Sequence, residues 1–397
     1  MIDSRAAPRL AIVVSHPIQY YSPWFRWMAQ HHSLDFKVWY LSDFGLRAAP
    51  DEKFGKTFAW DTDLTSGYAW EVVPNTSPKP DTLRFGGLRN PALFPRLTAD
   101  RPAAILLFGY NYHTHLRLIF WARRRNLPLI FRGDSHRLGR DRLPFWKQTL
   151  LRLLYRQFAA FTFVGAANRD YFRHAGVPQR KLFFAPHAVD QSLYDPNQAD
   201  HQAAAVALRA SLSLSPQTRV VLFAGKLIPS KQPLVLLDAF IRNRFSNTIL
   251  VFSGDGPERA QLQAKAADAA DRVRFLPFAN QSEMPARYAM ADLFVLPSDG
   301  SYETWGLAVN EAMHLGVPCL VSDRVGCQQD LVTDGQTGWV FRANDPSSLA
   351  QKLREALETS DDARQQIKRA IAEQIGQYSY EAATKGLRAA FDFVIST

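Results

Sequence analysis

The feature that most constrains the fold is a repeated alternation of short apolar runs with longer segments of helical patterning. Continuous apolar runs are typical of parallel strands that are buried on both faces of a sheet. Two such series follow one another, so the sequence predicts two doubly wound α/β domains. The first series is LAIVVS, AAILLFG, LPLIFRG, AAFTFVG and KLFFAPH, and the second is RVVLFAG, NTILVFSG, RVRFLPF, ADLFVLPS and VPCLVSD.

The length of the chain agrees with this organisation, because 397 residues suffice for about two domains of ordinary size. We predict an N-terminal domain over residues 1–195 and a C-terminal domain over residues 205–378. A polar linker and a helix occupy residues 194–217, and residues 380–397 have the pattern of a final amphipathic helix.

No segment approaches the roughly 20 apolar residues that a membrane-spanning helix needs. The first residues, MIDSRAAPRLAIVVSHP, carry the charges of a signal peptide, but their short apolar stretch is better interpreted as the first core strand. The two cysteines, Cys319 and Cys327, indicate buried free thiols in a reducing compartment and not a zinc site. We therefore expect a cytoplasmic protein.

The net charge of +10 is unevenly distributed along the chain. Residues 1–195 hold 27 Lys and Arg against 15 Asp and Glu, whereas the remainder holds 20 against 22. The excess of positive charge therefore belongs to the first half. It is consistent with an anionic membrane, with nucleic acid, or with solubility alone.

Two lysines follow the first apolar run of the second half. Gly225 ends that run, Lys226 comes next, and Lys231 is expected to open the following helix. Cations beside a helix N-terminus suit a phosphate-bearing ligand, although each lysine alone is also consistent with a solvated surface. Gly254 ends the next run, and the Asp255–Pro257 segment indicates a tight turn into another helix. We include Gly225 and Gly254 among the candidate binding residues.

The stretch SYETWGLAVNEAMHLGVPCLVSD contains a second candidate phosphate site. A helix is predicted to begin at Gly306 and to end near His314, with Gly316 as its C-terminal glycine. The amides of Gly306, Leu307 and Ala308 then point outwards, where they can hold an anion. A side chain at Gly306 is expected to obstruct a closely approaching phosphate.

Two carboxylates flank this predicted helix start. Glu303 precedes it and can reach hydroxyl groups beside the phosphate, and Glu311 lies on the first turns of the helix. A carboxylate there can accept both hydrogens of a cis-diol such as ribose. Either glutamate alone is consistent with a solvated surface, but the combination with the glycine and the two lysines favours a nucleotide site.

Residues 219–341 resemble the donor half of the retaining glycosyltransferases of family 4, which have the GT-B fold. The matching pieces are, in order, GKLIPSK, GDGP, RVRFLPF, ADLFVLPS, ETWGLAVNE, EAMHLGVPCLVSD and DGQTGWVF. Among them, ETWGLAVNE matches the family's signature of two glutamates separated by seven residues. The resemblance implies two Rossmann-like domains that face a central cleft, with the C-terminal helix crossing back onto the first domain.

The resemblance also implies roles for the residues of the donor half. Lys226 and Lys231 are expected to hold the diphosphate, and Glu303 the transferred sugar. Glu311 is expected to bind the ribose, and the amides of residues 306–308 the distal phosphate. The N-terminal domain is then the acceptor-binding domain.

The first half departs from the family pattern after its first strand. Relatives often carry a glycine-rich loop there, whereas this chain has SHPIQYYSPWFRW. His16 and Gln19 could anchor an acceptor with their polar groups, or Pro17 and Gln19 could only shape a tight turn.

Relatives often place a histidine near the reacting sugar carbon, after the fourth strand of the first domain. In the segment LPLIFRGDSHR, Asp134 lies near that position and His136 follows two residues later. Both stay candidates. Asp134 could be a base for the acceptor hydroxyl, and His136 could be either that base or the residue near the reacting carbon. His113 and His115 follow another strand end and are expected to line the cleft, but no third ligand for a metal is evident.

A metal site is not predicted elsewhere either. The DTD stretch at Asp61–Asp63 resembles the metal-binding carboxylates of another glycosyltransferase fold, which does not match the strand series. The lysines and the helix amides can carry the charge of the leaving group without a metal ion.

Residues 117–156 hold 11 basic and two acidic residues. Within this stretch, PFWKQTLLRLLYRQF has the pattern of an amphipathic helix, which favours either a membrane-surface helix or a core-packing helix with long basic side chains. The residues predicted near its apolar face are Phe145, Leu150, Leu153, Leu154 and Phe158.

These features together predict a retaining, metal-independent glycosyltransferase with no cofactor beyond its nucleotide diphosphate sugar donor. The acceptor is expected to be a glycan or a lipid-linked molecule of polysaccharide or glycolipid biosynthesis. The protein is then expected on the inner face of a membrane or free in the cytoplasm, with no nucleic acid as partner. Two alternatives are a GT-B nucleotide-sugar epimerase and a non-catalytic module that binds nucleic acid or membranes.

Overall fold

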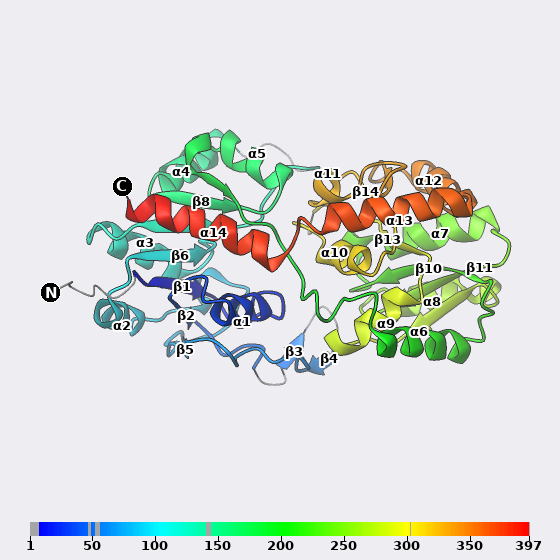
Figure 1. Ribbon diagram of the computed structural model, residues 1–397, viewed down its shortest axis with the longest axis horizontal. Coiled ribbons are helices and arrows are strands. Elements are labelled where there is room, and N and C mark those ends of the chain that lie inside the picture. The colour runs from blue at the N-terminus through cyan, green and yellow to red at the C-terminus, as the bar shows by residue number, and fades with distance from the viewer. Residues whose placement is uncertain (1–7, 47–48, 52–55, 140–143, 302, 397) are drawn as a thin grey trace.

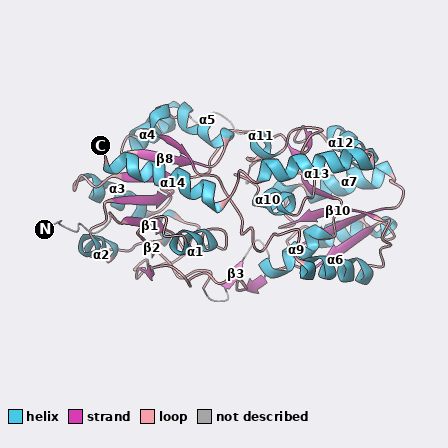
Figure 2. Cartoon of the chain, in the orientation of Figure 1, coloured by secondary structure: helices cyan, strands magenta, loops and turns pink. Residues whose placement is uncertain are grey.

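The computed structural model describes residues 8–46, 49–51, 56–139, 144–301 and 303–396. The chain forms two α/β units that lie side by side, each with a parallel sheet covered by helices on both faces (Figures 1 and 2). The two doubly wound domains predicted from the apolar runs are therefore confirmed. The start of the signal-like stretch, residues 1–7, lies outside the described residues.

The first sheet has seven strands in the order β5-β2-β1-β6-β7-β8-β9, and every neighbouring pair is parallel. Its order reverses between β1 and β6, the point at which ligands bind in open α/β sheets. The strands are β1 (Leu10–Val14), β2 (Phe36–Tyr40), β5 (Trp70–Val72), β6 (Ala104–Phe108), β7 (Leu129–Arg132), β8 (Ala160–Phe163) and β9 (Leu182–Phe184). A separate antiparallel hairpin joins β3 (Ala49–Asp51) to β4 (Lys56–Phe58).

The second sheet has six parallel strands in the order β12-β11-β10-β13-β14-β15, with its reversal between β10 and β13. Its strands are β10 (Arg219–Ala224), β11 (Thr248–Ser253), β12 (Val273–Leu276), β13 (Leu293–Leu296), β14 (Cys319–Ser322) and β15 (Gly338–Phe341). All ten predicted apolar runs are strands of one of the two sheets.

Three strands of the two sheets were not predicted, namely β2, β5 and β15, and the separate pair of β3 and β4 was not predicted either. None of them is a long continuous apolar run: β2 is interrupted by Lys37, and β5 is a three-residue edge strand that begins with the exposed Trp70. In β15, Gly338 is required because a Cβ at this position would lie 2.2 Å from the carbonyl oxygen of Cys319 on β14. Tertiary pairing therefore outweighs the weak local signal of these segments.

The helices of the first unit are α1 (Ser22–Gln30), α2 (Leu93–Asp100), α3 (His113–Arg123), α4 (Phe145–Tyr155) and α5 (Ala166–His174). The remaining helices are α6 (Ala199–Ser211), α7 (Pro233–Asn243), α8 (Arg259–Lys265), α9 (Met284–Ala289), α10 (Leu307–His314), α11 (Gln328–Leu331), α12 (Pro346–Glu358), α13 (Asp361–Ile375) and α14 (Tyr380–Ile395). Short 3₁₀ turns are η1 (Phe85–Gly87), η2 (Gln179–Lys181), η3 (Pro229–Lys231), η4 (Ala267–Ala269) and η5 (Gln281–Glu283). Lys231 was predicted to open α7, and this was wrong, because it is the last residue of the 3₁₀ turn η3.

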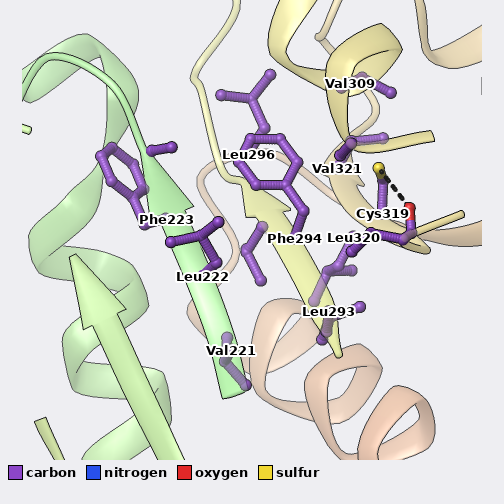
Figure 3. Close-up of a cluster of buried hydrophobic side chains, with 14 of the residues drawn as sticks. Val221, Leu222, Phe223, Leu293, Phe294, Leu296, Val309, Cys319, Leu320 and Val321 are labelled. Carbon is purple, nitrogen blue, oxygen red and sulfur yellow. Dashed lines mark hydrogen bonds between the residues drawn. The ribbon is translucent and has the colours of Figure 1, made fainter. Parts of the chain in front are cut away.

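The core of the second unit joins three central strands to α10. Figure 3 shows side chains of β10, β13 and β14 packed together beneath Val309 of α10. Cys319 belongs to this core, and both Cys319 and Cys327 are buried free thiols, as predicted. The burial of Leu222, Phe294 and Leu320 is complete, so the cluster anchors α10 on the sheet.

The C-terminal helix α14 crosses back onto the first unit, as the resemblance implied (Figure 1). Its buried face belongs to the same hydrophobic cluster as β1 and α1, and Trp24 donates a hydrogen bond from Nε1 to Oγ1 of Thr384 at 2.9 Å. The contact with β9 is especially close, because a Cβ at Gly386 would lie 1.7 Å from the carbonyl oxygen of Phe184.

We expect Gly386→Ala to destabilise the protein by about 1–3 kcal/mol, because the added methyl group overpacks the interface between α14 and β9. In a helix without this contact, the same change stabilises by up to about 1 kcal/mol. The sign of the change in unfolding free energy therefore shows whether α14 packs closely against β9. Thermal unfolding of the variant measures it, with the exposed neighbour Lys385→Ala as control. A variant with an unchanged or higher melting temperature would contradict this account of the α14 contact.

Candidate functional site

A cavity of about 460 Å³ lies where the carboxyl ends of the two sheets face each other. This volume is within the range of sites for small ligands. The first unit contributes Ile18, Gln19, Tyr20, Tyr21, Trp60, Asp134 and His187. The second unit contributes Ala224, Gly225, Lys226, Lys231, Ser253, Gly254, Phe278, Ala279, Gln281, Met284, Tyr288, Glu303, Thr304, Trp305, Gly306, Leu307, Ala308 and Glu311.

A partly buried ion pair joins two of the predicted residues in this cavity. Nζ of Lys231 lies 3.0 Å from Oε2 of Glu303, and Oγ of Ser298 donates to the same oxygen at 3.2 Å. The side chains of Lys231 and Glu303 are 17% and 16% exposed, so water screens the pair only in part. Lys226 also lines the cavity, so both predicted cations are brought to one place.

Two strand-end glycines allow the loops around these lysines to approach each other. Gly225 and Gly254 have φ values of +141° and +142°, which side chains rarely adopt. A Cβ at Gly254 would lie 2.0 Å from the carbonyl oxygen of Gly225. The sequence therefore needs glycine at Gly254 to bring the ends of β10 and β11 together under the cavity.

Helix α10 begins where it was predicted and directs its first residues to the cavity. Gly306 precedes it with φ +104°, and Gly316 follows it with φ +71°. However, a Cβ at Gly306 would meet Cγ1 of Val325 at 2.9 Å and Cδ2 of Leu296 at 3.2 Å. The left-handed backbone and the packing beneath α10 therefore require glycine here independently of any ligand. The expected role of Gly306 in admitting a phosphate stays a prediction.

Glu311 is almost completely buried, with 3% of its surface exposed. Its Oε1 accepts a hydrogen bond from the hydroxyl of Tyr20 at 3.0 Å, and its Oε2 accepts one from the hydroxyl of Tyr288 at 2.7 Å. Burial raises the pKa of Glu311, and the tyrosine hydroxyls oppose this rise by stabilising the charged form. The carboxylate lines the cavity, but both of its oxygens already have a partner.

Asp134 enters the cavity from the end of β7. Its Oδ2 accepts a hydrogen bond from Oγ1 of Thr304 at 2.8 Å and lies 3.6 Å from Nε2 of His187. Burial alone would raise the pKa of Asp134, but the contacts with His187 and Thr304 outweigh it and lower this pKa to about 2. Asp134 is therefore ionised near neutral pH, whereas burial lowers the pKa of His187 and favours its neutral form.

His136 has a different place from Asp134. Its Nδ1 accepts a hydrogen bond from the amide of Leu138 at 3.1 Å, so Nε2 carries the proton and donates to the carbonyl oxygen of Glu303 at 2.8 Å. The ring is buried and does not line the cavity. Of the two candidates left open by the sequence, Asp134 faces the cavity and His136 holds the backbone of Glu303.

Three histidines predicted near the ligand lie outside the lining of the cavity. His16 is bonded through Nδ1 to Oγ of Ser15 at 2.9 Å, and burial lowers its pKa to about 4. His113 is the first residue of α3 and packs edge-on against Phe85, and its neighbour His115 is fully buried with neither ring nitrogen in a hydrogen bond. The expectation that His113 and His115 line the cleft was wrong for the buried His115, and His113 is not part of this cavity's lining, whereas Gln19 is. The role of His16 and Gln19 in anchoring an acceptor stays a prediction.

The carboxylates of the DTD stretch are engaged in other contacts. Asp61 accepts hydrogen bonds from the amide and the hydroxyl of Ser282 in the second unit. Asp63 accepts from two amides of its own turn and pairs with Arg26 at 3.2 Å. Within the described ranges, no group of three or more His, Cys, Asp or Glu side chains is placed to hold a metal ion.

Several residues of the cavity were not identified from the sequence. His187 is the last residue of the run KLFFAPH, so the rule that ligands bind beyond strand ends could have found it. Tyr20 lies in the segment that replaces the glycine-rich loop, and nothing in that segment indicates a contact with the other domain. Tyr288 and Thr304 are likewise brought in only by the tertiary structure.

Residues 205–373 match the family model described as "Glycosyl transferases group 1". A mannosyltransferase of Mycolicibacterium smegmatis, named as GDP-mannose-dependent and acting on phosphatidylinositol monomannoside, is 30% identical over 56% of this chain and 59% of its own. The sulfoquinovosyl transferase SQD2 of Arabidopsis thaliana is 29% identical over 62% of this chain and 46% of its own. The matched part thus spans about half the length of these curated relatives.

Solved structures show the same fold over nearly the whole chain. A glycosyltransferase from Rickettsia africae has a TM-score of 0.76 at 10% identity and covers 99% of this chain and 100% of its own. HepE of Anabaena, solved with UDP and glucose, has a TM-score of 0.69 at 18% identity, with coverages of 97% and 99%. At these identities the similarity establishes the fold, and the expected GT-B architecture is confirmed.

The raised pKa of Glu311 predicts how stability depends on pH. The folded state holds the proton of this carboxyl group more tightly than the unfolded state, so stability falls as pH rises above the ordinary glutamate value. We expect the melting temperature of the native protein, relative to that of Glu311→Gln, to be higher at pH 5 than at pH 7. Paired thermal unfolding at the two values measures this, and a difference of the opposite sign would contradict the assignment.

Proposed function

Because its second half is a group 1 glycosyl transferase domain within a GT-B fold, we propose that this protein transfers a sugar from a nucleotide diphosphate sugar to an acceptor hydroxyl. The observation that carries the proposal is the convergence of Lys226, Lys231, Glu303 and the start of α10 on one cavity between the two domains. The first domain then binds the acceptor and the second binds the donor.

The cations of the cavity supply the charge that the donor needs. In our proposal, Lys226 and Lys231 bind the diphosphate together with the amides at the start of α10, and Lys231 exchanges Glu303 for a phosphate oxygen. Negative charge develops on that phosphate as the glycosidic bond breaks, so preorganised cations there lower the barrier. Glu303, released from the lysine, can then accept hydrogen bonds from hydroxyls of the sugar. This arrangement lets the side chains and amides carry the charge without a divalent metal.

The acceptor oxygen attacks the sugar carbon on the face from which the phosphate leaves, and the configuration is retained. The electrons of the broken C–O bond pass to the phosphate oxygen, which takes the proton of the acceptor hydroxyl. Asp134 is poorly suited to be this base, because a group with a pKa of about 2 accepts protons weakly near neutral pH. Its permanent charge can instead stabilise the positive charge that develops on the sugar, while its contact with His187 holds that imidazole in place.

The donor is sought first with a panel of nucleotide sugars, since a bound donor raises the melting temperature of the protein. With that donor, we expect Lys231→Ala to lower turnover by about 10²-fold or more, because it removes charge from the leaving phosphate. Glu303→Gln is expected to lower the rate of transfer more than the affinity for the free nucleoside diphosphate. Steady-state kinetics and titration separate the two effects.

The control for these variants is Lys265→Ala. Lys265 lies in the same domain, is 44% exposed and pairs with Asp238 outside the cavity, so its loss should leave turnover near the native value. Near-normal turnover of Lys231→Ala and Glu303→Gln with the identified donor would rule out the site assignment. Conversion of the donor without any acceptor would favour the epimerase instead.

The surface of the first domain supports a second part of the proposal, association with an anionic membrane. Helix α4 exposes Phe145, Trp146, Leu150 and Leu153, with exposed fractions from 48% to 79%. The predicted face was partly wrong, because Phe158 is buried in the core of the domain. The exposed residues form an apolar strip that no described element covers, which is typical of an interfacial helix.

Basic side chains lie next to this apolar strip. Arg123, at the end of α3, donates a hydrogen bond to Gln157 just beyond α4, so the run of Arg123, Arg124 and Arg125 adjoins the helix. Each basic residue near an anionic surface adds about 1 kcal/mol to binding. No helix in the described part of the chain is long and apolar enough to cross a membrane. We propose reversible attachment through α4 and these arginines, with a lipid-linked or anionic glycan as acceptor.

We expect co-sedimentation with vesicles to increase with the content of anionic lipid and to decrease with salt. Changing Arg123, Arg124 and Arg125 to Glu should weaken it, and so should Trp146→Ser with Leu150→Ser. A matched charge control is Lys352→Glu with Arg354→Glu on α12 of the second domain, which should bind like the native protein. Equal recovery in the supernatant with neutral and anionic vesicles at low salt would contradict membrane attachment.

A further inference from the structure

Tyr20 connects the two domains at the most deeply buried carboxylate of the cavity. It lies in the loop between β1 and α1 of the first domain, yet its ring packs against the hydrophobic cluster of the second domain. Its hydroxyl donates to Oε1 of Glu311 at 3.0 Å. The contact spans the cleft, so it depends on how the domains are placed.

The second tyrosine that donates to Glu311, Tyr288, belongs to the same domain as Glu311. Tyr288 belongs to α9 of the second domain, and its ring packs edge-on against Phe294 of β13 at 5.4 Å. It is buried with 1% of its surface exposed, so it forms a fixed wall behind Glu311. Of the two donors, Tyr20 is the one that can leave without disturbing the core of the donor domain.

We propose that Tyr20 is a specificity-determining residue of the donor site, because its hydroxyl occupies the place on Glu311 that a ribose hydroxyl takes in the bound state. A ribonucleotide then exchanges its hydroxyl for that of Tyr20. The inference rests on the proposed function, in which Glu311 receives the ribose of the donor. It adds a residue of the acceptor domain to the groups that select the nucleotide.

The exchange determines how strongly the site distinguishes ribose from deoxyribose. A buried carboxylate oxygen that is left without a donor is costly, so a site of this kind ordinarily rejects a ligand that lacks the hydroxyl. Here Tyr20 can keep its hydrogen bond to Glu311 when the ligand has no hydroxyl to offer. A ribonucleotide gains one hydrogen bond to Glu311 and displaces that of Tyr20. The native site should therefore discriminate only weakly between ribonucleotides and nucleotides that lack the hydroxyl.

The experiment measures dissociation constants of UDP, GDP and their 2′,3′-dideoxy forms by titration calorimetry. For the base that binds, we expect the ribo and dideoxy forms to differ by about threefold or less on the native protein. On Tyr20→Phe, the ribonucleotide should bind about tenfold more tightly because its hydroxyl no longer displaces a partner of Glu311, while the dideoxy form should not tighten.

Tyr21→Phe is the matched control, since it removes a phenol from the same loop. The centroid of the Tyr21 ring lies 5.9 Å from the guanidinium carbon of Arg132, and the hydrogen bonds to Glu311 come from Tyr20 and Tyr288. The ratio of the ribo and dideoxy affinities on Tyr21→Phe should therefore equal the native ratio. Thermal unfolding of both variants checks that they are folded. If Tyr20→Phe is not folded, the ratio of the dideoxy to the ribo dissociation constant on the native protein tests the role of Tyr20.

The outcomes separate this inference from the proposed function. A Tyr20→Phe variant that binds the ribonucleotide no more tightly than the native protein overturns the role of Tyr20 and leaves the proposed function standing. A native preference for the ribo form of about 30-fold or more also overturns it. Failure of UDP, GDP and every nucleotide sugar of the panel to bind the native protein overturns both.

Discussion

The packing of α14 against the first sheet is the contact on which the geometry of the cleft depends. The chain passes from the first domain to the second through the linker and returns through α14, so the two domains are tied twice. The close approach of Gly386 to Phe184 leaves little freedom in the position of this helix. Contacts across the cleft follow from it, including those of Tyr20 with Glu311, of Asp134 with Thr304, and of Asp330 with the amide of Ala166.

Within that cleft, charged groups are paired because an isolated charge is costly in a region partly removed from water. Lys231 is paired with Glu303, Asp134 with Thr304 and His187, and Glu311 with two tyrosines. A ligand that carries phosphates and hydroxyls can replace these partners one by one. In the proposed binding step, these side chains exchange their internal partners for groups of the donor. The free energy that each side chain contributes to binding is then the difference between its interaction with the donor and its interaction with the internal partner.

The division of charge between the halves of the chain has a structural counterpart. The arginine run at the end of α3 adjoins an exposed apolar strip on α4, whereas in the near-neutral second domain Lys231 of the cavity is paired with Glu303. Exposed apolar side chains that are ordered on a helix are uncommon on a soluble surface unless they bind a partner. In the proposed membrane attachment, this surface of the first domain faces the lipid.

The two parallel sheets could be predicted from the amino-acid sequence alone, because continuous apolar runs indicate strands that are buried on both faces and need no knowledge of distant residues. The sequence also predicted α10 with its flanking glycines, Lys226 just beyond the end of β10, and Glu303 ahead of α10, whereas the 3₁₀ turn that carries Lys231 was not predicted. Only the tertiary structure decided which of Asp134 and His136 faces the cavity, and that His113 and His115 do not. The directions of these side chains depend on loops that meet across the cleft. The hydrophobic periodicity of a single helix or strand therefore does not predict them. The contact of Tyr20 with Glu311 is the extreme case, since 291 positions separate the two residues and only the docking of the domains brings them together.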